Sequence, residues 1–226
     1  RCRNADAGYA LRVKSRAERR DSVQKSLDAL RIQRETNRSR SRMLQEMQRD
    51  YEGFSKAVRL VMQEAKGGRL GQIDGPVSAL IRTRDDLTVA IETALGAAMQ
   101  NIVVGSEADG KAAIRFLKRC DGGRATFLPK STIQGRALQE RGLEQCLGFV
   151  GVAADLVEYD PAYTGVIGNL LGRIVLVENL DHAVEMARRF QNRFKIVTLD
   201  GQVMNPGGSM TGGSASKSAG ILSRAN

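Results

Sequence analysis

The chain has 226 residues, of which 42% are hydrophobic, and a formal net charge of +10. This length accommodates one or two domains with a substantial core, and no stretch approaches the roughly 18 consecutive apolar residues of a membrane helix. The first residues also lack the apolar segment of a signal peptide. Cys2, Cys120 and Cys146 fit neither a disulfide framework nor metal-ligand spacing. We therefore expect reduced thiols in a cytoplasmic protein without a membrane partner.

The positive charge is concentrated in the first third of the chain. Residues 1–66 hold 17 Lys and Arg against 9 Asp and Glu, a net charge of +8, whereas residues 67–226 hold 18 against 16, a net charge of +2. A basic segment of this kind indicates an anionic partner, nucleic acid first. A solvated, arginine-rich helix would explain the charge equally well.

Residues 1–66 contain no proline and have a heptad-like apolar pattern. The spacing is alternately three and four residues at Leu44, Met47, Tyr51, Phe54, Val58, Val61 and Ala65. Upstream, Val23, Leu27 and Leu30 keep the same rhythm, but the two runs are three residues out of step across the polar tract 31–42, which marks a break or local overwinding. This pattern predicts a coiled-coil arm over residues 1–66. An amphipathic helix of a globular bundle is the alternative.

Glycines at 67, 68, 71 and 75 end the helical pattern, and strand-like and helix-like segments alternate from there. In a first subdomain, about 70–130, the expected elements are an apolar run at Val77–Ile81, helices over Asp86–Gly96 and Asp109–Cys120, and strands over Asn101–Val104 and Ala125–Leu128.

A second subdomain, about 153–213, repeats this alternation after a linker of residues 130–152. Expected there are strands over Ala154–Val157, Ile174–Val177 and Lys195–Leu199, helices over Ala162–Leu171 and Asp181–Phe190, and a further helix within the linker over Gln134–Arg141. Asp200-Gly201 is interpreted as a two-residue type I′ turn that leads back through Gln202–Met204. The sequence thus predicts an α/β (α+β) fold of two β-α-β-α-β-like subdomains with mixed sheets, preceded by a long coiled-coil helix. Ser214–Asn226 looks unpacked.

The segment Gly207–Ser214 contains four closely spaced glycines and has two functional interpretations. It resembles the phosphate-binding pattern G-x-x-x-x-G-K-[ST], but Gly213 stands at the lysine position and a polar tail follows in place of a helix. Nucleotide binding by an enzyme domain is therefore the weaker alternative. The stronger interpretation is a bare sheet edge, on which a second copy of the chain docks by backbone pairing.

The sequence predicts no catalytic residues and no metal site. His182 is the single histidine and begins a helix; Asp85-Asp86 fits a helix N-terminus better than a catalytic dyad; and Cys120 and Cys146 have no partnered base.

Several segments taken together resemble the hinge region of SMC proteins, the structural maintenance of chromosomes family, in a bacterial form. The matching segments are Ile91–Gly96, Gln100–Val104, Gly123–Pro129, Asn169–Gly172, Val197–Gly201 and Asn205–Gly213. The resemblance implies a hinge domain over residues 67–213 that homodimerises in a ring with two interfaces, with residues 214–226 beginning a returning arm. The interface would include Gly207, Gly208, Thr211, Gly212 and Gly213.

The same resemblance implies partners and a cellular role. In the family, hinges bind DNA through basic surface near the coil, and the positions available here are Arg59, Lys66, Arg69, Lys217 and Arg224. It also implies a returning coiled-coil helix of the same parent chain, contacts of other condensin-complex subunits elsewhere on that parent, and a place on the chromosome in the cytoplasm. ATP and Mg²⁺ would belong to head domains of the parent, so no cofactor is expected in this segment.

Overall fold

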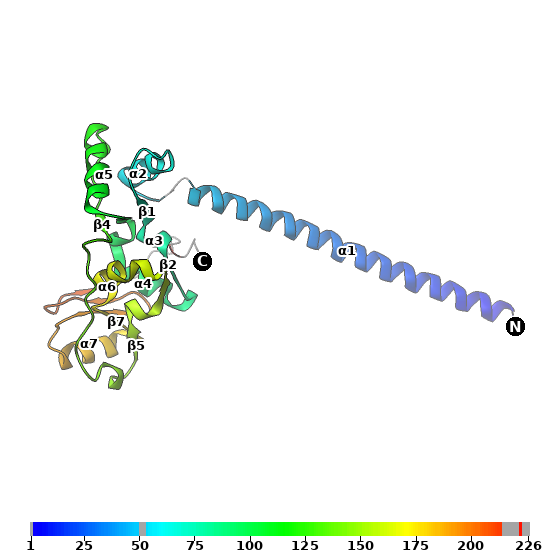
Figure 1. Ribbon diagram of the computed structural model, residues 1–226. Coiled ribbons are helices and arrows are strands. Elements are labelled where there is room, and N and C mark those ends of the chain that lie inside the picture. The colour runs from blue at the N-terminus through cyan, green and yellow to red at the C-terminus, as the bar shows by residue number, and fades with distance from the viewer. Residues whose placement is uncertain (1, 50–52, 214–221, 223–226) are drawn as a thin grey trace. The chain divides into compact units, whose positions relative to one another are not determined.

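The computed structural model describes residues 2–49, 53–213 and 222, and the side chains of residues 8–43, 53–213 and 222. The chain divides into two units, Arg1–Glu52 and Gly53–Asn226, which we describe separately (Figure 1).

The first unit consists of one long helix, α1 (Cys2–Arg49). Residues 2–49 contain no proline and only Gly8 among the glycines, so little interrupts helix propagation. The predicted upstream seam residues Val23, Leu27 and Leu30 are exposed in the single chain. The side chains of Leu44 and Met47, and all of Tyr51, lie outside the described residues.

The predicted continuous seam from Leu44 to Ala65 is wrong. The helix α1 ends at Arg49, and a second helix, α2 (Lys56–Lys66), begins after Gly53, whose φ is 91°, and the N-cap Ser55. The apolar face of α2 is buried within the second unit, with Val61 fully inaccessible. The compact unit therefore begins at Gly53 and includes α2, whose residues the heptad spacing assigns to the arm.

The first half of the compact unit is built on a three-stranded sheet in the order β1-β3-β4, formed by Ile73–Pro76, Ile102–Val104 and Phe127–Pro129. β1 and β3 are antiparallel, whereas β3 and β4 are parallel and connected by α5 (Glu107–Arg119). Figure 1 shows α2 beside α5 at one end of the unit. Between β1 and β3 lie α3 (Val77–Leu80), β2 (Ile81–Thr83), η1 (Asp85–Leu87), α4 (Thr88–Leu95) and η2 (Gly96–Gln100).

The second half contains a five-stranded sheet in the order β10-β9-β8-β7-β5, formed by Met210–Thr211, Val203–Met204, Lys195–Thr198, Ile174–Val177 and Phe149–Val152. β7 and β8 are parallel and connected by α7 (Leu180–Arg189); the other pairs are antiparallel. The remaining elements are η3 (Leu143–Gln145), η4 (Ala153–Leu156), β6 (Val157–Tyr159), η5 (Pro161–Tyr163) and α6 (Thr164–Leu171). Both subdomains therefore carry mixed sheets, as predicted.

The linker segment 134–141 is not the predicted helix. It runs extended over the glycine-containing face of α6, where the Arg136 N–H donates to the Gly168 carbonyl oxygen at 3.3 Å. A Cβ built on Gly135 would lie 3.3 Å from the Gly168 Cα, so the two backbones approach without side chains between them. The expected strand Ala154–Val157 is also wrong in position. Residues 153–156 form a 3₁₀ turn, and the strand of this region, β5, lies just before that turn.

One hydrophobic core spans both halves of the compact unit. It includes Ile91 and Val103 from the first half and Leu171 and Leu176 from the second, and the antiparallel pair β2–β6 joins the halves beside it. Leu222 belongs to the same core, is 1% exposed, and donates its N–H to Glu92 Oε1 at 2.7 Å. The expectation that the C-terminal residues are unpacked is therefore wrong at Leu222. Among the described residues, no helix has the length and apolar content needed to span a membrane.

Candidate dimer interface

The predicted interface residues follow the β8–β9 hairpin. The Thr198 N–H donates to the Gln202 carbonyl oxygen at 2.9 Å, and the Gly201 N–H donates to the Thr198 carbonyl oxygen at 2.9 Å. Gly201 has a φ of 86°, but Asp200 does not have a positive φ. The connection is therefore a three-residue loop that ends in a left-handed glycine, and not the predicted type I′ turn, which needs positive φ at both central residues.

A second reversal of the same size leads from β9 into β10. The Gly208 N–H donates to the Asn205 carbonyl oxygen at 3.0 Å, and the Asn205 N–H donates to the Ser209 carbonyl oxygen at 2.8 Å. Gly207 and Gly208 have φ values of 85° and 95°, which a residue with a side chain rarely adopts. These two glycines are required by the turn itself, whatever docks beside it.

Strand β10 is the edge of the five-stranded sheet, and within the described part of the chain no strand pairs with its outer side. In β9–β10, Val203 lies opposite Thr211 and Met204 opposite Met210. Because Asn205 and Ser209 form a hydrogen-bonded pair, the antiparallel alternation makes Val203 and Thr211 the next such pair. The N–H and C=O groups of Met210 and Gly212 consequently point away from β9, toward the open edge.

The end of β10 is held by Gln202, a residue for which the sequence predicts no role at the interface. Its Oε1 accepts the Gly213 N–H at 2.8 Å, and its Nε2 donates to the Gly213 carbonyl oxygen at 3.2 Å. A Cβ on Gly212 would collide with Gln202 Oε1. The feature of the sequence that could have indicated this role is the position of Gln202 directly after the hairpin turn, because its side-chain amide can reach the neighbouring strand from there.

The structure thus brings the five predicted interface residues together on one exposed edge. They are Gly207, Gly208, Thr211, Gly212 and Gly213. The stretch between the glycine pairs forms strand β10, whereas a phosphate loop would wrap its amides around an anion. This arrangement favours docking of another strand over nucleotide binding.

The predicted DNA-contacting residues occupy a different part of the compact unit. Arg59 and Lys66 are exposed on α2, and Arg69 follows it, with its Nη1 3.3 Å from Glu64 Oε2. Lys217 and Arg224 lie outside the described residues. Within the described part, the structure therefore groups three of the five positions on and just after α2.

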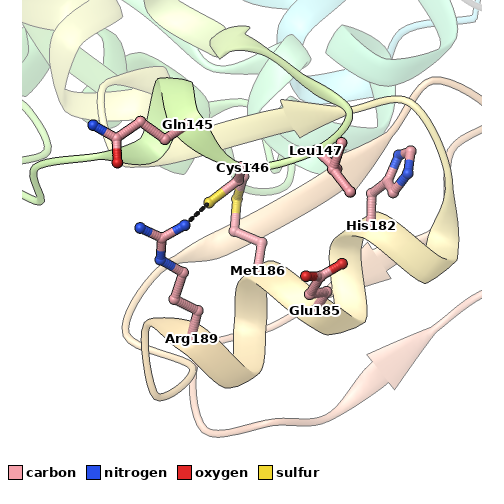
Figure 2. A pocket seen from close by; sticks show the side chains of 7 residues that line it. All are labelled: Gln145, Cys146, Leu147, His182, Glu185, Met186 and Arg189. Atoms are coloured by element: carbon pink, nitrogen blue, oxygen red, sulfur yellow. Dashed lines mark hydrogen bonds between the residues drawn. The ribbon is translucent and has the colours of Figure 1, made fainter.

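A small cavity in the second half contains Cys146 and His182 but no base-activated thiol (Figure 2). The Cys146 Sγ accepts from Arg189 Nη1 at 3.4 Å and donates to the Gly142 carbonyl oxygen at 3.7 Å. Figure 2 shows His182 at the other end of this cavity. The thiol proton is thus directed at a main-chain carbonyl, and the geometry does not form a thiol–imidazole dyad.

The remaining candidate residues have structural partners. The Asn179 side chain caps α7 by accepting the His182 N–H at 3.0 Å, and Asp86 pairs with Arg84 at 2.6 Å in the turn before α4. Among the described residues, no group of three or more His, Cys, Asp or Glu side chains is placed to hold a metal ion.

The family model described as "SMC proteins Flexible Hinge Domain" matches residues 70–187. The chain belongs to the SMC protein family. The SMC hinge match runs from before β1 to within α7, so it covers the first subdomain and the second as far as α7, and stops before β8, β9 and β10.

Solved structures and curated relatives agree with this assignment. The chain is 45% identical to the Geobacillus stearothermophilus SMC hinge domain, crystallised as an asymmetric dimer, with a TM-score of 0.80 over 86% of this chain and 79% of that one. For the Pyrococcus furiosus SMC hinge domain the identity is 28% and the TM-score 0.60, over 76% and 86% of the two chains. The chromosome partition protein Smc of Bacillus subtilis is 47% identical over 183 residues, which are 80% of this chain but 15% of that relative.

The SMC match thus concerns a small part of much longer relatives, and that part is the hinge. The Geobacillus and Pyrococcus structures are SMC hinge domains, and the chain has their fold.

Proposed function

We propose that this chain is the homodimerisation hinge of a chromosome-segregation SMC protein, where it joins two coiled-coil arms. The observation that carries the proposal is the open edge of β10, where the backbone groups of Met210 and Gly212 face outward beside glycines. A strand from a second copy can pair there without a side chain holding it off. The asymmetric dimer of the Geobacillus relative supports self-association.

The first subdomain offers a complementary edge. In β4, Thr126 and Lys130 bond to β3, so the alternating backbone groups of Phe127 face the other way. If β10 of one copy pairs with β4 of the other, a two-fold axis generates the same contact twice and closes a ring. This arrangement accounts for a dimer with two equivalent interfaces and keeps the edges from recruiting further copies.

The test removes one outward donor. Met210→Pro deletes an N–H that does not take part in the β9–β10 ladder, and proline is tolerated at such an edge position. Losing one hydrogen bond at each of two equivalent interfaces should cost about 1–3 kcal/mol, which is about a five- to 150-fold rise in the dimer Kd. Sedimentation equilibrium over a concentration series measures this Kd.

Met210→Thr is the matched control, because it changes the same side chain but keeps the N–H and the strand propensity. It should dimerise like the unmodified chain. A Met210→Pro chain with a native circular dichroism spectrum and an unchanged dimer Kd would contradict the proposal. The two Met210 variants test the interface more directly than glutamate substitutions at Gly208 and Gly212. A side chain at Gly208 would strain the turn, and one at Gly212 would collide with Gln202, so either could prevent dimerisation by changing the fold of the edge.

We further propose weak, sequence-independent DNA binding by the same chain, which would place it on the chromosome. Support comes from the net charge of +8 over residues 1–66 and from the exposed cations Arg59, Lys66 and Arg69 beside α2. Lys217 and Arg224 extend this candidate set. Such binding depends on counterion release and should fall steeply with salt. ATP hydrolysis belongs, in this proposal, to other parts of a longer protein.

A further inference from the structure

The Gln202 side chain continues the pairing of β10 at a point where the main chain of β9 cannot. Beyond the last paired residues of β9 and β10, the next hydrogen-bonded pair of the antiparallel ladder would join Gly201 and Gly213. The Gly201 N–H, however, already donates to the Thr198 carbonyl oxygen in the hairpin loop, at 2.9 Å. The main chain of Gly201 is thus held by the loop and cannot make this pair.

The side-chain amide of Gln202 makes the missing pair of hydrogen bonds. Its Oε1 accepts the Gly213 N–H at 2.8 Å, and its Nε2 donates to the Gly213 carbonyl oxygen at 3.2 Å. A facing residue of a strand would make these same two bonds. A primary amide can replace that residue because it carries an acceptor and donors side by side, as the peptide group does. The ladder of β10 is therefore extended through Gly213 without the main chain of β9.

Neighbouring contacts fix the position and the orientation of this amide. The Thr198 N–H donates to the Gln202 carbonyl oxygen at 2.9 Å, and the Gln202 N–H donates to Thr198 Oγ1 at 2.8 Å. Thr198 is fully buried, so the base of the Gln202 side chain is attached to the core. Asp200 Oδ2 lies 3.4 Å from Nε2. An ionised carboxylate accepts but does not donate, so Asp200 favours the orientation in which Nε2 faces it.

The Gln202 amide determines the direction of the outward backbone groups of Gly212. Thr211 pairs with the main chain of β9 and Gly213 with the amide, so Gly212 is held from both sides. Two consecutive glycines lose more conformational freedom on ordering than other residues do. Because they are already extended in the single chain, pairing with a second copy orders fewer residues and costs less entropy.

We infer that Gln202 is a positioning residue for self-association, which holds Gly212 and Gly213 in the extended conformation that a strand of a second copy pairs with. The inference rests on the proposed dimerisation through β10 and adds the residue that prepares this edge. If Gln202 served only the stability of the hairpin, its loss would ease unfolding of the chain without changing the dimer Kd.

The test measures the dimer Kd by sedimentation equilibrium at about pH 8 and about pH 4. Gln202→Met has a side chain of similar length but makes neither bond to Gly213, and should raise the Kd about tenfold at both pH values. Gln202→Glu keeps the acceptor, but its ionised carboxylate cannot donate to the Gly213 carbonyl oxygen. Protonation near the ordinary glutamic acid pKa of about 4.3 restores a donor. The Kd of Gln202→Glu, relative to the unmodified chain, should therefore fall from about tenfold toward one on acidification.

Two controls isolate the introduced group. Gln139→Met removes an exposed glutamine side chain of the linker and should leave the Kd unchanged at both pH values. Asp200 is the titratable side chain that the structure places beside Gln202, and it titrates in the same pH range. Repeating the comparison with Asp200→Asn in every chain removes its contribution, and the acid recovery of Gln202→Glu should persist.

The outcomes separate this inference from the proposal beneath it. If the unmodified chain is monomeric, dimerisation itself is refuted and the role of Gln202 falls with it. If Met210→Pro weakens the dimer but Gln202→Met does not, the edge stands and the role of Gln202 is refuted. A Gln202→Glu chain whose relative Kd is the same at both pH values also overturns the inference, because the donor to Gly213 then has no effect. Should Gln202→Met lose its native circular dichroism spectrum, Gln202→Glu at the two pH values decides.

Discussion

The Asp109 carboxylate connects α5 to the segment that precedes β1. It accepts the Ser106 N–H at 2.9 Å, the Ser106 hydroxyl at 2.7 Å and the Gln72 N–H at 3.1 Å. The hydrogen bond from the Ser106 hydroxyl is the main cause of a lowered pKa of Asp109. The motif Ser106-x-x-Asp109 is a capping box that the sequence displayed. The predicted helix nevertheless began at Asp109, because apolar periodicity alone does not reveal a cap.

Asp109→Ala should destabilise the compact unit by about 1–2 kcal/mol near neutral pH, because it removes the carboxylate that accepts hydrogen bonds from Ser106 and from the Gln72 N–H, although the N-cap Ser106 itself remains. The folded-state pKa is below the unfolded value of about 3.9, so the stabilisation by Asp109 is present above about pH 4 and is lost as pH falls through the lower folded pKa. Urea unfolding of both chains at a series of pH values measures the difference. Glu107→Ala, in the same first turn, is the control; a deficit of Asp109→Ala that stays constant into strong acid would contradict this account.

Among the elements, the two halves are tied by more than the β2–β6 pair. Lys130, just after β4, places its Nζ 2.6 Å from Asp74 Oδ2 on β1 and 5.3 Å from the ring centroid of Tyr163 in η5. Both charged side chains are largely buried, and the Asp74 carboxylate raises the pKa of the Lys130 ammonium. The ion pair thus connects two strands of the first half and touches the second.

Lys130→Met should destabilise the compact unit by about 1–3 kcal/mol, because it leaves the Asp74 carboxylate buried without its partner. Adding Asp74→Asn should recover part of this loss, since the unpaired charge is then gone. A double-mutant cycle by urea unfolding measures the coupling. The same cycle on the exposed Arg84–Asp86 pair should show no measurable coupling. Equal coupling energies in both cycles would show that burial does not determine how much the Lys130–Asp74 pair contributes to stability.

The elements that periodicity predicted well are those decided by local pattern. The strand Ile174–Val177 and the C-terminal end of the helix at Leu171 appear at the predicted residues, because a short apolar run predicts a buried strand and helix-spaced apolar residues predict a helix. The linker is predicted to be partly helical over residues 134–141, but the backbone of this segment bonds to α6 and to Gly172 at its end, more than 30 residues away in sequence. Strand β5 was missed because Phe149–Val152 is only partly buried and contains Gly151.

The candidate interface was predictable as a set but not in its details. Glycine density located the edge, because no other residue readily tolerates the φ values at Gly207 and Gly208. Which backbone amides of β10 face outward depends on which residues of β9 and β10 lie opposite each other. That register is set by the structure of the hairpin and is not visible in the sequence of β10 alone. The role of Gln202 depends on the same register, because its amide contacts Gly213 in the strand beside it.

At the scale of the whole molecule, the decisive boundary is that between arm and compact unit. The heptad spacing of apolar residues continues past Gly53 to Ala65, so the sequence does not reveal that the helix is interrupted there. A helix that packs on a globular core and a helix that packs on a second helix both bury one apolar face, and their apolar spacing is therefore alike. The family match, which begins at residue 70, does not mark the boundary either. The burial of α2 places it at Gly53.

Two truncations test this boundary directly. A chain of residues 53–226 should unfold at the same temperature as the full chain, because the core of the compact unit contains no described residue before Ala57. A chain of residues 67–226 loses the buried Ala57, Val58, Val61 and Met62. Burial of a large apolar side chain contributes about 1.5–3 kcal/mol, so this loss approaches a domain's whole stability of about 5–15 kcal/mol.

Circular dichroism during heating distinguishes the two outcomes. We expect one cooperative transition for residues 53–226 and a strongly lowered or absent transition for residues 67–226, since removing α2 also uncovers the face of α5 against which it packs. If residues 67–226 and the full chain unfolded at the same temperature, α2 would not be part of the compact unit, and its assignment to the arm would stand. A lowered transition for residues 53–226 would instead mean that the arm contributes to the stability of the hinge, and the two units could no longer be treated as independent.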